Sequence, residues 1–358
     1  MRLSSVAHSI RTAARLAARG QLDQVVYQGI VACSLPLFAP RFPRILTIEP
    51  TNRCNLRCPI CPTGSGRLRR EMHDMSFSDF RRLVEEASGR TRMILLHFCG
   101  EPFLCDNIIP MVELATRKGI AVELSTNGMF LESMTFCRQL VRSGLRHLVV
   151  ALDGADQETL VVYRRGACFQ SIVDGIAHLR EARDAEASPM PTIELQLILM
   201  KHNEHQRQEM RLLARQLRVD RYTEKTLGMM GLSLSSPEGE RLARAFLPAS
   251  DRDSRFSYGS ERVVRMEPSR RFRCRSIHEV GVILSNGIMV PCCYDPHGLY
   301  PMGNALTEGI ASVWRGRRFR EFRRQVHRPS SRPLMCAACS ESRADLNLPS
   351  TELQSGVG

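Results

Sequence analysis

The sequence predicts an α/β protein, built as a partial (β/α)6, TIM-like barrel that is followed by a small, cysteine-rich α+β domain. Two observations support this prediction. From about Ile45, short apolar runs alternate with segments of helical periodicity, which is the pattern of βα units around a parallel sheet. After residue 272 the pattern changes to a hairpin and a pair of helices. An open, doubly wound sheet is the alternative, and in both architectures ligands bind at the carboxyl ends of the strands.

Six strands are expected in the barrel, and six crossovers suit a partial barrel better than a closed barrel of eight units. The strands are Ile45–Glu49, Met93–Phe98, Val122–Ser125, His147–Leu152, Ile193–Met200 and Arg221–Thr226. Apolar residues three or four positions apart predict helices between them. The helices begin near Ser76 or Ser78 and cover Ile108–Arg117, Met134–Ser143, Phe169–Arg183 and His205–Leu217.

Residues 1–44 are expected to form an N-terminal helical extension. Arg11, Arg15 and Arg19 recur every four residues among alanines, which predicts an amphipathic helix over the first twenty residues. A transit peptide or a membrane-surface helix is the alternative. The segment lacks the continuous apolar region of a signal peptide, and Val25–Pro40 is too short to span a bilayer as a helix of ~20 residues. We therefore expect no transmembrane segment, reduced thiols and a cytoplasmic location.

The chain is basic, with a formal net charge of +13. Nearly all of the excess is arginine, because Lys118, Lys201 and Lys225 are the only lysines. The arginines are spread along the chain, apart from one dense cluster at Arg317–Arg324. This usage favours a coding bias over a nucleic-acid surface, so we expect no specific nucleic acid as a partner. A basic surface can still attract an anionic substrate.

The second half of the chain changes character after the expected barrel, residues 45–227. Residues 228–272 are rich in Gly, Ser, Pro and charge, and we expect a linker or bridging segment there. Beyond it, apolar runs flank Asn286-Gly287, a pair favoured in a type I′ turn because both central residues need positive φ. Residues 273–345 are expected to form the small domain and residues 346–358 a tail. Two helices, roughly Gly309–Arg315 and Arg318–Val326, precede its last cysteines.

Cys54, Cys58 and Cys61 follow the first strand in a CxxxCxxC arrangement. Three thiolates on one loop can hold a cubane iron–sulfur cluster, and such clusters favour soft ligands. Four thiolates would saturate the cluster, whereas three leave one iron open to a substrate or cofactor. The alternatives are buried structural cysteines or a zinc site, for which His73 is the only nearby histidine.

This motif resembles that of the radical S-adenosylmethionine (radical SAM) superfamily. The resemblance implies that the amine and the carboxylate of S-adenosylmethionine chelate the open iron of a 4Fe–4S cluster. It also implies that reductive cleavage of S-adenosylmethionine gives a 5′-deoxyadenosyl radical, which abstracts hydrogen from a substrate.

Three further segments resemble family motifs in the expected order. Cys99-Gly100-Glu101-Pro102 is similar to the Gly-Gly-Glu-Pro motif that meets the cofactor's amino group, although Cys99 replaces the first glycine. Ser125-Thr126-Asn127-Gly128 resembles the stretch beside the ribose and carboxylate, and Leu152-Asp153-Gly154 resembles Ser-Leu-Asp-Gly, with Ala151 replacing the serine. Alone, a strand-end Glu, Asn or Asp is usually a cap or turn residue. The resemblance implies cofactor-binding roles for Gly100, Glu101, Ser125, Asn127 and Asp153.

A second cysteine group follows the bridging segment and consists of Cys274, Cys292, Cys293, Cys336 and Cys339. Its spacing resembles the SPASM-type C-terminal domain of radical enzymes. That family pattern has seven cysteines, so the five here imply a single auxiliary 4Fe–4S cluster with four ligands, suited to passing electrons. The ligands implied are Cys274, Cys292, Cys336 and Cys339. A structural zinc site is the alternative.

Cys293 and Asp295 are candidate catalytic residues. Cys293 adjoins an implied ligand, and three roles are open to it: hydrogen donor to a substrate radical, alternative cluster ligand, or small buried apolar side chain. Asp295 is either a general base or a turn residue before Pro296.

The combined interpretation is a radical SAM oxidoreductase. An auxiliary cluster that accepts one electron would complete the two-electron oxidation of a small polar metabolite, such as a sugar or aminocyclitol, or of a peptide. About 44 residues precede the barrel, too few for the leader-binding domain of many peptide-modifying relatives. The alternatives are an epimerase or isomerase using Cys293, a RiPP peptide maturase, and a non-enzymatic iron–sulfur or zinc scaffold. The expected partners are the substrate and an electron donor such as flavodoxin or ferredoxin.

Overall fold

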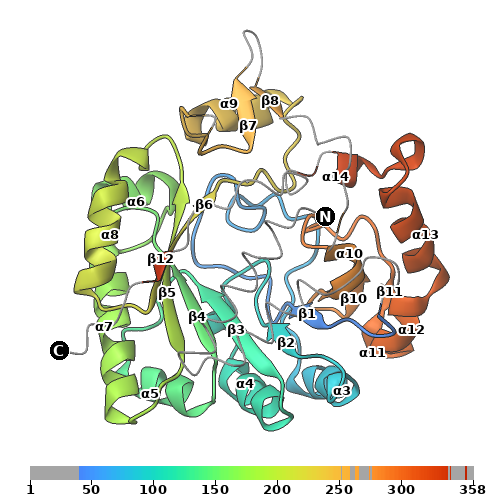
Figure 1. Ribbon diagram of the computed structural model, residues 1–358, viewed down its shortest axis with the longest axis horizontal. Helices are drawn as coiled ribbons and strands as arrows, with labels where there is room; N and C mark the ends of the chain where they lie inside the picture. Colours follow the sequence, from blue (N-terminus) through green and yellow to red (C-terminus); the bar gives the residue numbers. More distant parts are fainter. Residues whose placement is uncertain are drawn as a thin grey trace, which may run out of the picture. The chain divides into compact units, whose positions relative to one another are not determined.

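A single ten-stranded sheet organises the protein in a computed structural model, with the strand order β11-β10-β9-β1-β2-β3-β4-β5-β6-β12 (Figure 1). The structure describes residues 40–250, 252–258, 263–265, 274, 276–337, 339 and 351–352. The amphipathic helix expected over residues 1–20 lies outside the described residues, as does most of the expected extension 1–44 and of the tail 346–358.

Six consecutive parallel strands form the centre of this sheet, and each pairs with the next along the chain. The sheet does not close on itself, so the architecture is the predicted partial barrel. All six predicted strands are present, with ends within three residues of those expected. They are β1 Ile45–Ile48, β2 Met93–Leu95, β3 Ala121–Thr126, β4 His147–Ala151, β5 Thr192–Leu199 and β6 Arg221–Thr226.

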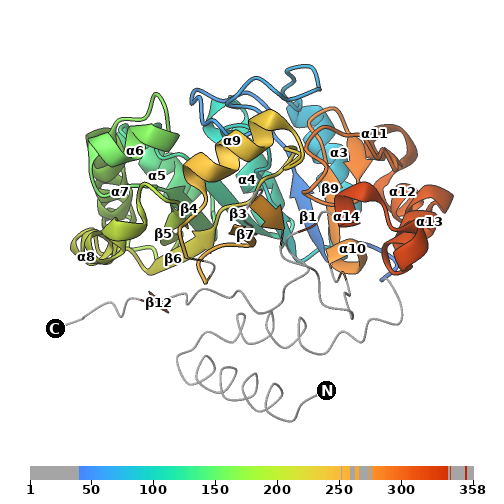
Figure 2. The ribbon, with the colours of Figure 1, turned by 90° about the horizontal axis from the view of Figure 1, so that it is seen from above.

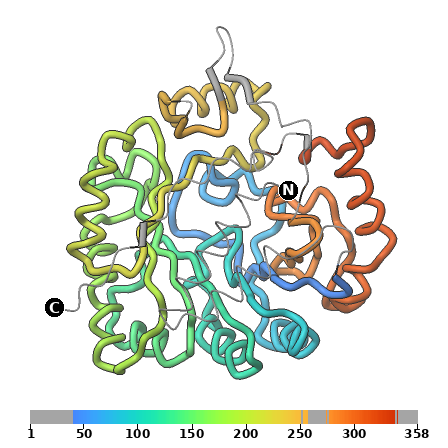
Figure 3. The backbone as a smooth tube through the Cα atoms, viewed as in Figure 1, coloured from blue at the N-terminus to red at the C-terminus, as the bar shows by residue number. Residues whose placement is uncertain are grey.

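The predicted helices cover the outer face of the sheet (Figures 1 and 3). Ser76 caps the first by accepting a hydrogen bond from Asp79 N, which explains where that helix begins. The short helix α6 (Gln157–Tyr163) was not predicted, because seven residues give too few turns for a clear periodicity. The predicted helices are α3 Phe77–Ala87, α4 Ile108–Arg117, α5 Met134–Arg142, α7 Phe169–Ala185 and α8 Arg207–Gln216.

Alternation along the strands separates the two faces of the sheet. In β3, Val122, Leu124 and Thr126 are buried, whereas the residues between them are only half-buried. On the half-buried face Glu123 contacts His147 of β4, with 2.9 Å between Oε2 and Nδ1. The interior of the barrel is therefore partly polar, while the apolar core lies between the sheet and the helices.

The expected bridging segment 228–272 holds more regular structure than its composition indicates. Helix α9 (Pro237–Phe246) forms within it, with Ser236 accepting a hydrogen bond from Gly239 N and Pro237 in the first turn. Strands β7 (Phe256–Tyr258) and β8 (Val263–Arg265) pair as an antiparallel hairpin. We therefore correct the expectation of a loose linker for these described parts.

The C-terminal module continues the barrel's sheet. Strand β9 (Val280–Ile283) pairs in parallel with β1, and β10 (Ile288–Val290) and β11 (Gly303–Asn304) extend it in antiparallel fashion. Strand β12 (Thr351–Glu352) pairs with β6 at the other edge. Figure 2 separates α6, α7 and α8, beside β4–β6, from the helices of this module. These are α10 Ser276–Glu279, α11 Ala305–Glu308, α12 Ile310–Arg315, α13 Arg317–Val326 and α14 Leu334–Ala337.

The turn between β9 and β10 differs from the predicted type I′ turn. Gly287 has a φ of +83°, but Asn286 is not among the residues with positive φ. Gly287 N donates to Leu284 O at 2.8 Å and Leu284 N donates to Ile288 O at 2.9 Å. This pattern fits a longer loop with one left-handed glycine. A Cβ at position 287 would lie 2.5 Å from the Leu306 side chain, so packing also requires glycine.

Candidate functional site

The first cysteine loop leaves the carboxyl end of β1 and is fastened at several points. The side chain of Asn52 donates to Glu71 O at 2.7 Å and accepts from His73 N at 2.8 Å. A Cβ on Gly64 would lie 2.7 Å from Cys58 N, so only glycine allows the loop to fold this tightly. Arg70 and Glu49 form a bidentate pair of 2.7 and 2.8 Å with both side chains nearly inaccessible to solvent. The sequence thus fixes the loop before any cofactor is considered.

Cys54, Cys58 and Cys61 lie close together on this loop. Burial raises the pKa of the Cys54 thiol to about 11 and that of Cys58 to about 12, and the charge of Cys61 adds to both shifts. Leu56 N donates to Cys54 Sγ at 3.4 Å, a contact that stabilises a thiolate. Bonding to iron would offset the cost of ionising buried thiols. The donor set therefore fits a cluster held by three thiolates.

Neither cysteine group is arranged as a site for a single metal ion such as a structural zinc. Among the described residues, no three Cys, His, Asp or Glu side chains are arranged to hold one metal ion. In a cubane cluster each thiolate instead binds a different iron, so the sulfurs need not converge on one point.

Gly100 and Glu101 bring the end of β2 against the cysteine loop. Gly100 has a φ of +102°, and a Cβ there would lie 2.6 Å from Thr51 O and 2.7 Å from Arg53 O. Glycine is therefore required at position 100. Cys99 is buried where the resembled motif has another glycine.

The carboxylate of Glu101 is buried and held by three hydrogen bonds. It accepts from Thr126 Oγ1 at 2.7 Å, from Asn127 N at 2.7 Å and from Phe103 N at 3.2 Å. Burial nevertheless raises the pKa of Glu101 to about 7. Thr126 was not among the predicted site residues, although it stands between two that were. A cationic group bound here would favour the ionised carboxylate.

Asn127 connects β3 to the cysteine loop. Its Nδ2 donates to Asn55 Oδ1 at 2.7 Å, and its Oδ1 accepts from Met129 N at 3.0 Å. Ser125 lies one residue before Thr126 and is half-buried, so its side chain is on the opposite face of β3 from the bonds to Glu101. The structure thus places Asn127 next to the loop, and Ser125 on the barrel's interior face.

Asp153 follows β4 and forms a buried ion pair that the sequence did not reveal. Its Oδ2 lies 2.7 Å from Arg164 Nε, and its Oδ1 accepts from Ile198 N at 2.8 Å. Arg164 is only 9 % exposed. Its positive charge lowers the pKa of Cys54 and of Cys58, which opposes part of the increase caused by burial. Arg164 follows α6, away from any strand end, so no motif signals it. The signal available was an arginine next to the apolar segment Val161–Tyr163.

The second cysteine group also comes together. Burial raises the pKa of Cys292 and of Cys336. The neighbouring thiols Cys293, Cys336 and Cys274 add to the shift of Cys292, and Cys274 and Cys339 add to that of Cys336. The side chains of Cys274, Cys292, Cys336 and Cys339 are half-buried. Tyr294 N donates to Cys292 Sγ at 3.4 Å, as Leu56 N does in the first group. The chemistry of these donors fits a cluster closed by four protein thiolates.

Cys293 and Asp295 occupy different environments. Cys293 is exposed, which disagrees with the interpretation as a buried apolar side chain. Protein around it still desolvates the thiolate and raises the pKa of Cys293 to about 11. Asp295 is 2 % exposed, and its two oxygens accept from Leu299 N and Tyr300 N at 2.8 Å each. Asp295 therefore holds a loop, which is the role that the turn interpretation gives it.

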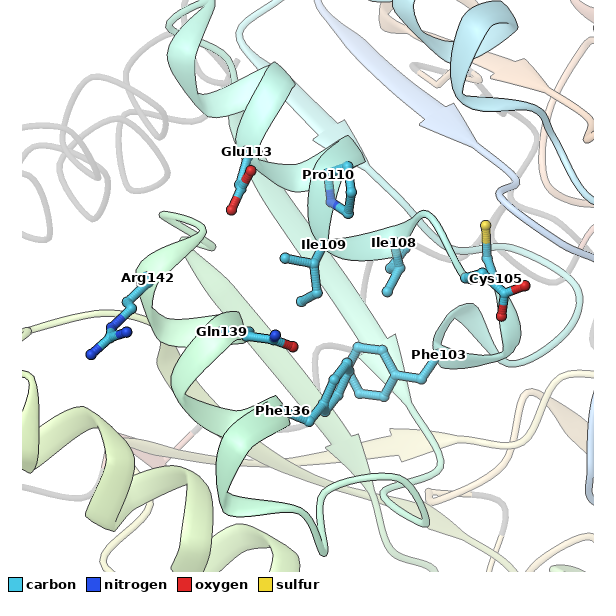
Figure 4. A pocket seen from close by; sticks show the side chains of 10 residues that line it. Phe103, Cys105, Ile108, Ile109, Pro110, Glu113, Phe136, Gln139 and Arg142 are labelled. Carbon is cyan, nitrogen blue, oxygen red and sulfur yellow. The ribbon is translucent and has the colours of Figure 1, made fainter.

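A pocket of about 480 Å³ lies elsewhere, between the outer helices α4 and α5 (Figure 4). Phe103 and Phe136 meet there edge to face, with ring centroids 5.0 Å apart. The pocket is lined by α4, by α5 and by the segment that precedes α4. Its link to the site is Phe103, whose backbone N–H binds Glu101.

Comparison with known proteins agrees with this geometry. The family model described as the radical SAM superfamily matches residues 48–244, and the model described as an iron–sulfur cluster-binding (SPASM) domain matches residues 274–340. The chain belongs to the radical SAM superfamily. It carries a SPASM domain at its C-terminal side, and the two family matches imply a 4Fe–4S cluster that binds S-adenosylmethionine and auxiliary iron–sulfur ligation. It is an enzyme, as the members of the superfamily that it matches are.

Similar proteins differ widely in what they do. The chain is 29 % identical to 7,8-dihydro-6-hydroxymethylpterin dimethyltransferase of Methanocaldococcus jannaschii, over 34 % of this chain and 24 % of that protein. It is 23 % identical to the tungsten-containing aldehyde ferredoxin oxidoreductase cofactor-modifying protein of Pyrococcus furiosus, over 78 % and 83 %. It spans less than half of the first three curated relatives that it matches.

A solved structure shares the fold. SuiB of Streptococcus suis, bound to S-adenosylmethionine, superimposes with a TM-score of 0.59 at 16 % identity, covering 86 % of this chain and 73 % of that one. No helix among the described residues is long and apolar enough to cross a membrane.

Proposed function

We propose that the protein is a radical SAM oxidoreductase that removes two electrons from a small polar molecule or a peptide in the cytoplasm. The observation that supports this reaction is the second cysteine group, in which four half-buried thiols accompany the exposed Cys293. Four protein thiolates would close an auxiliary cluster, and a closed cluster is suited to electron transfer rather than to substrate binding.

In this proposal the first site divides its tasks among a few residues. Cys54, Cys58 and Cys61 hold the cluster, and the bound cluster and S-adenosylmethionine together supply the radical that takes hydrogen from the substrate. Glu101 accepts hydrogen bonds from the cofactor's amino group, because it is a buried carboxylate next to the loop. Gly100 lets the two segments approach each other.

The other polar residues orient this site. Arg164 would pair with the anionic end of the cofactor, because it is a cation near the cluster cysteines, where it lowers the pKa of Cys58. Asp153 positions Arg164 through their 2.7 Å contact. Asn127 fixes the cysteine loop through Asn55, and Ser125 faces the interior of the barrel beside the expected cofactor.

The second site would take the electron. Once hydrogen has been removed, a carbon radical beside a hydroxyl or amine becomes strongly reducing when it also loses a proton. Cys274, Cys292, Cys336 and Cys339 would hold the cluster that receives that electron. Asp295 is left out of the proposed catalytic set, because its hydrogen bonds to Leu299 N and Tyr300 N account for it as a loop residue.

Metal analysis and cleavage assays test the cofactor assignment. We expect about 8 irons per chain in anaerobically reconstituted protein, and about 4 when Cys54, Cys58 and Cys61 are all replaced by alanine. The triple variant should form no 5′-deoxyadenosine from S-adenosylmethionine and dithionite. Continued cleavage by that variant would overturn the assignment.

A mass measurement tests the reaction. Candidate sugars, aminocyclitols and peptides are screened for those that increase 5′-deoxyadenosine formation, and the product is analysed after turnover in deuterated water. The proposal expects a product lighter by two hydrogens. A product of unchanged composition that carries solvent deuterium would instead identify an epimerase.

That second candidate function is favoured by one observation, the exposure of Cys293 beside the auxiliary site. An exposed thiol could return a hydrogen atom to a substrate radical. Cys293→Ala separates the two reactions: it should abolish deuterium incorporation by an epimerase and leave an oxidation in place.

A further inference from the structure

The auxiliary module carries a dense positive surface that neither the fold nor the proposed site uses. Six arginines on or next to α12 and α13 are exposed, and we call them the arginine face. Glu321 is the only acidic residue between positions 315 and 328. In the part of the chain that the structure describes, none of the six has an ion pair with a carboxylate. They are Arg315, Arg317, Arg318, Arg320, Arg324 and Arg328.

Packing accounts for the other side of α13 but not for this face. Phe319, Phe322 and Val326 are buried against the module. Arg323 is also buried: its guanidinium lies 4.1 Å from the centre of the Trp314 ring and donates to Ile277 O and Trp314 O at 3.0 and 2.8 Å. Arg323 thus has a structural role, whereas the six exposed arginines contribute nothing to the core.

The arginine face is electrostatically unfavourable in the isolated chain. Arg317, Arg320 and Arg324 are spaced three and four residues apart on one helix, where like charges repel. Arg317, Arg318 and Arg320 also lie in its first turn, where the helix dipole favours anions over cations. A bound acidic surface would relieve both effects.

The C-terminal end of the arginine face adjoins the segment that carries two of the auxiliary cysteines. Arg332 Nε donates to Val326 O at 3.0 Å, which ties the end of α13 to the segment that enters α14. Leu334 begins α14 and is 82 % exposed, and Cys336 follows two residues later. An exposed apolar residue two positions before a cluster ligand, on a module that also carries an exposed cationic helix, is suited to the small and transient interfaces of electron-transfer proteins.

We propose that the arginine face and Leu334 form the docking surface for an acidic one-electron carrier protein, which removes the electron from the auxiliary cluster after each turnover. This inference rests on the proposed function. The reduced cluster loses one electron and the oxidised carrier gains one, so the module returns to its starting state. No bond is formed or broken in this step.

Other anionic partners fit the structure less well. A helix that lies on a membrane inserts its apolar side into the lipid, but Phe319, Phe322 and Val326 are buried inside the protein. A nucleic acid would be attracted by charge alone, and neither partner explains an exposed Leu334 two residues before Cys336. Both remain outcomes of the test.

Binding is measured first, with oxidised flavodoxin as the probe and the full-length reconstituted protein. Arg317→Glu with Arg320→Glu should weaken binding at low salt by about tenfold or more. The same double variant should be at least as heat-stable as the parent, because both new carboxylates lie in the first turn of α13. Loss of binding could then not be attributed to unfolding.

A matched control reverses two exposed arginines elsewhere, Arg215→Glu on α8 and Arg241→Glu on α9, which changes the net charge equally. The proposal expects this control to bind flavodoxin nearly as tightly as the parent. Equal weakening by both double variants would show non-specific attraction and overturn the proposal. Charge-dependent binding to anionic vesicles or to single-stranded RNA, without binding to flavodoxin, would also overturn it.

Electron transfer is then measured without any substrate. The variant with alanine at positions 54, 58 and 61 retains only the auxiliary cluster. After this variant is reduced and desalted, stopped-flow absorbance follows electron transfer to oxidised flavodoxin. Adding the Arg317 and Arg320 reversals should slow the transfer at least tenfold but leave oxidation by neutral benzoquinone unchanged. Because substrate is absent, this result does not depend on which reaction the enzyme catalyses. If electron transfer to flavodoxin is equally fast with and without the Arg317 and Arg320 reversals, the proposal is wrong.

Discussion

Arg70 holds Glu49 in a two-point contact, 2.7 and 2.8 Å long, that joins the cysteine loop to the base of the auxiliary module. The Glu49 carboxylate also accepts a hydrogen bond of 2.9 Å from Ser285 N, and Arg70 Nε donates one of 2.7 Å to Pro296 O. One buried pair therefore contacts the first site and the hairpin that leads to the second.

Breaking this pair should destabilise the protein strongly. Arg70→Met leaves the Glu49 carboxylate buried without its cation, and we expect a loss of about 3–5 kcal/mol in the free energy of unfolding. Urea denaturation of the anaerobic protein measures it. Arg142→Met is the control, because the Arg142–Glu186 pair lies on the surface and should matter little. Comparable losses in both variants would contradict the assigned role.

Gly100→Ala should disrupt the first site by a steric route. The new Cβ would lie 2.6 Å from Thr51 O, and the φ of +102° is itself strained for alanine. Iron content and 5′-deoxyadenosine formation should both fall. Gly89→Ala is the matched control: it has a φ of +70° but nothing within 4 Å of its Cβ, so it should cost only about 1–2 kcal/mol of backbone strain. A fully loaded, active Gly100→Ala variant would refute the argument.

Arg164→Met should lower the reduction potential of the first cluster. Its positive charge acts on Cys54 and Cys58, and a nearby cation favours the reduced, more negative state. Potentiometric titration followed by electron paramagnetic resonance measures the shift. Arg164→Lys keeps the charge and should restore much of the potential. If Arg164→Met leaves the reduction potential of the first cluster unchanged, Arg164 does not influence that cluster.

The polar barrel interior predicts a pH window of stability. Desolvation lowers the pKa of His147, but its contacts with Glu123 and Glu194, at 2.9 and 3.1 Å, outweigh that effect and raise it to about 9. Desolvation raises the pKa of Glu194, but the contacts with His147 and Thr223 outweigh it and lower the value to about 2. Both folded-state values differ from those of the unfolded chain.

The sign of each effect follows from linkage. The raised pKa of His147 stabilises the fold fully below its ordinary value of 6.5, and this contribution is lost as the pH rises towards 9. The lowered pKa of Glu194 stabilises the fold above its ordinary value of 4.5, and this contribution is lost as the pH falls towards 2. Unfolding free energy should thus be highest between about pH 4.5 and 6.5. In His147→Gln the decline between pH 6.5 and 9 should largely vanish, and its persistence would contradict the assignment.

Local sequence patterns were enough to predict the strands, the long helices and the cysteine groups, because each of these depends on residues that are close together in the sequence. Arg164 could not be predicted in this way, since its partner Asp153 and the thiols it faces come from other parts of the chain. The helix α9 was missed because Gly and Ser dominate its surroundings, although Ser236-Pro237 is a helix start signal. At the hairpin, Asn286-Gly287 indicated a turn correctly, but only Gly287 has the positive φ that a type I′ turn needs at both central positions.

Because β9 pairs in parallel with β1, the barrel depends on the C-terminal module for part of its sheet. Ile45 lies opposite Val280 and Ile48 opposite Ile283, so the module supplies the neighbour that β1 needs on that side. If the chain is cut before the module, the edge of β1 that pairs with β9 is left with unpaired amides and carbonyls. Such an exposed edge promotes self-association. A truncated barrel should therefore precipitate rather than survive as a simpler catalyst.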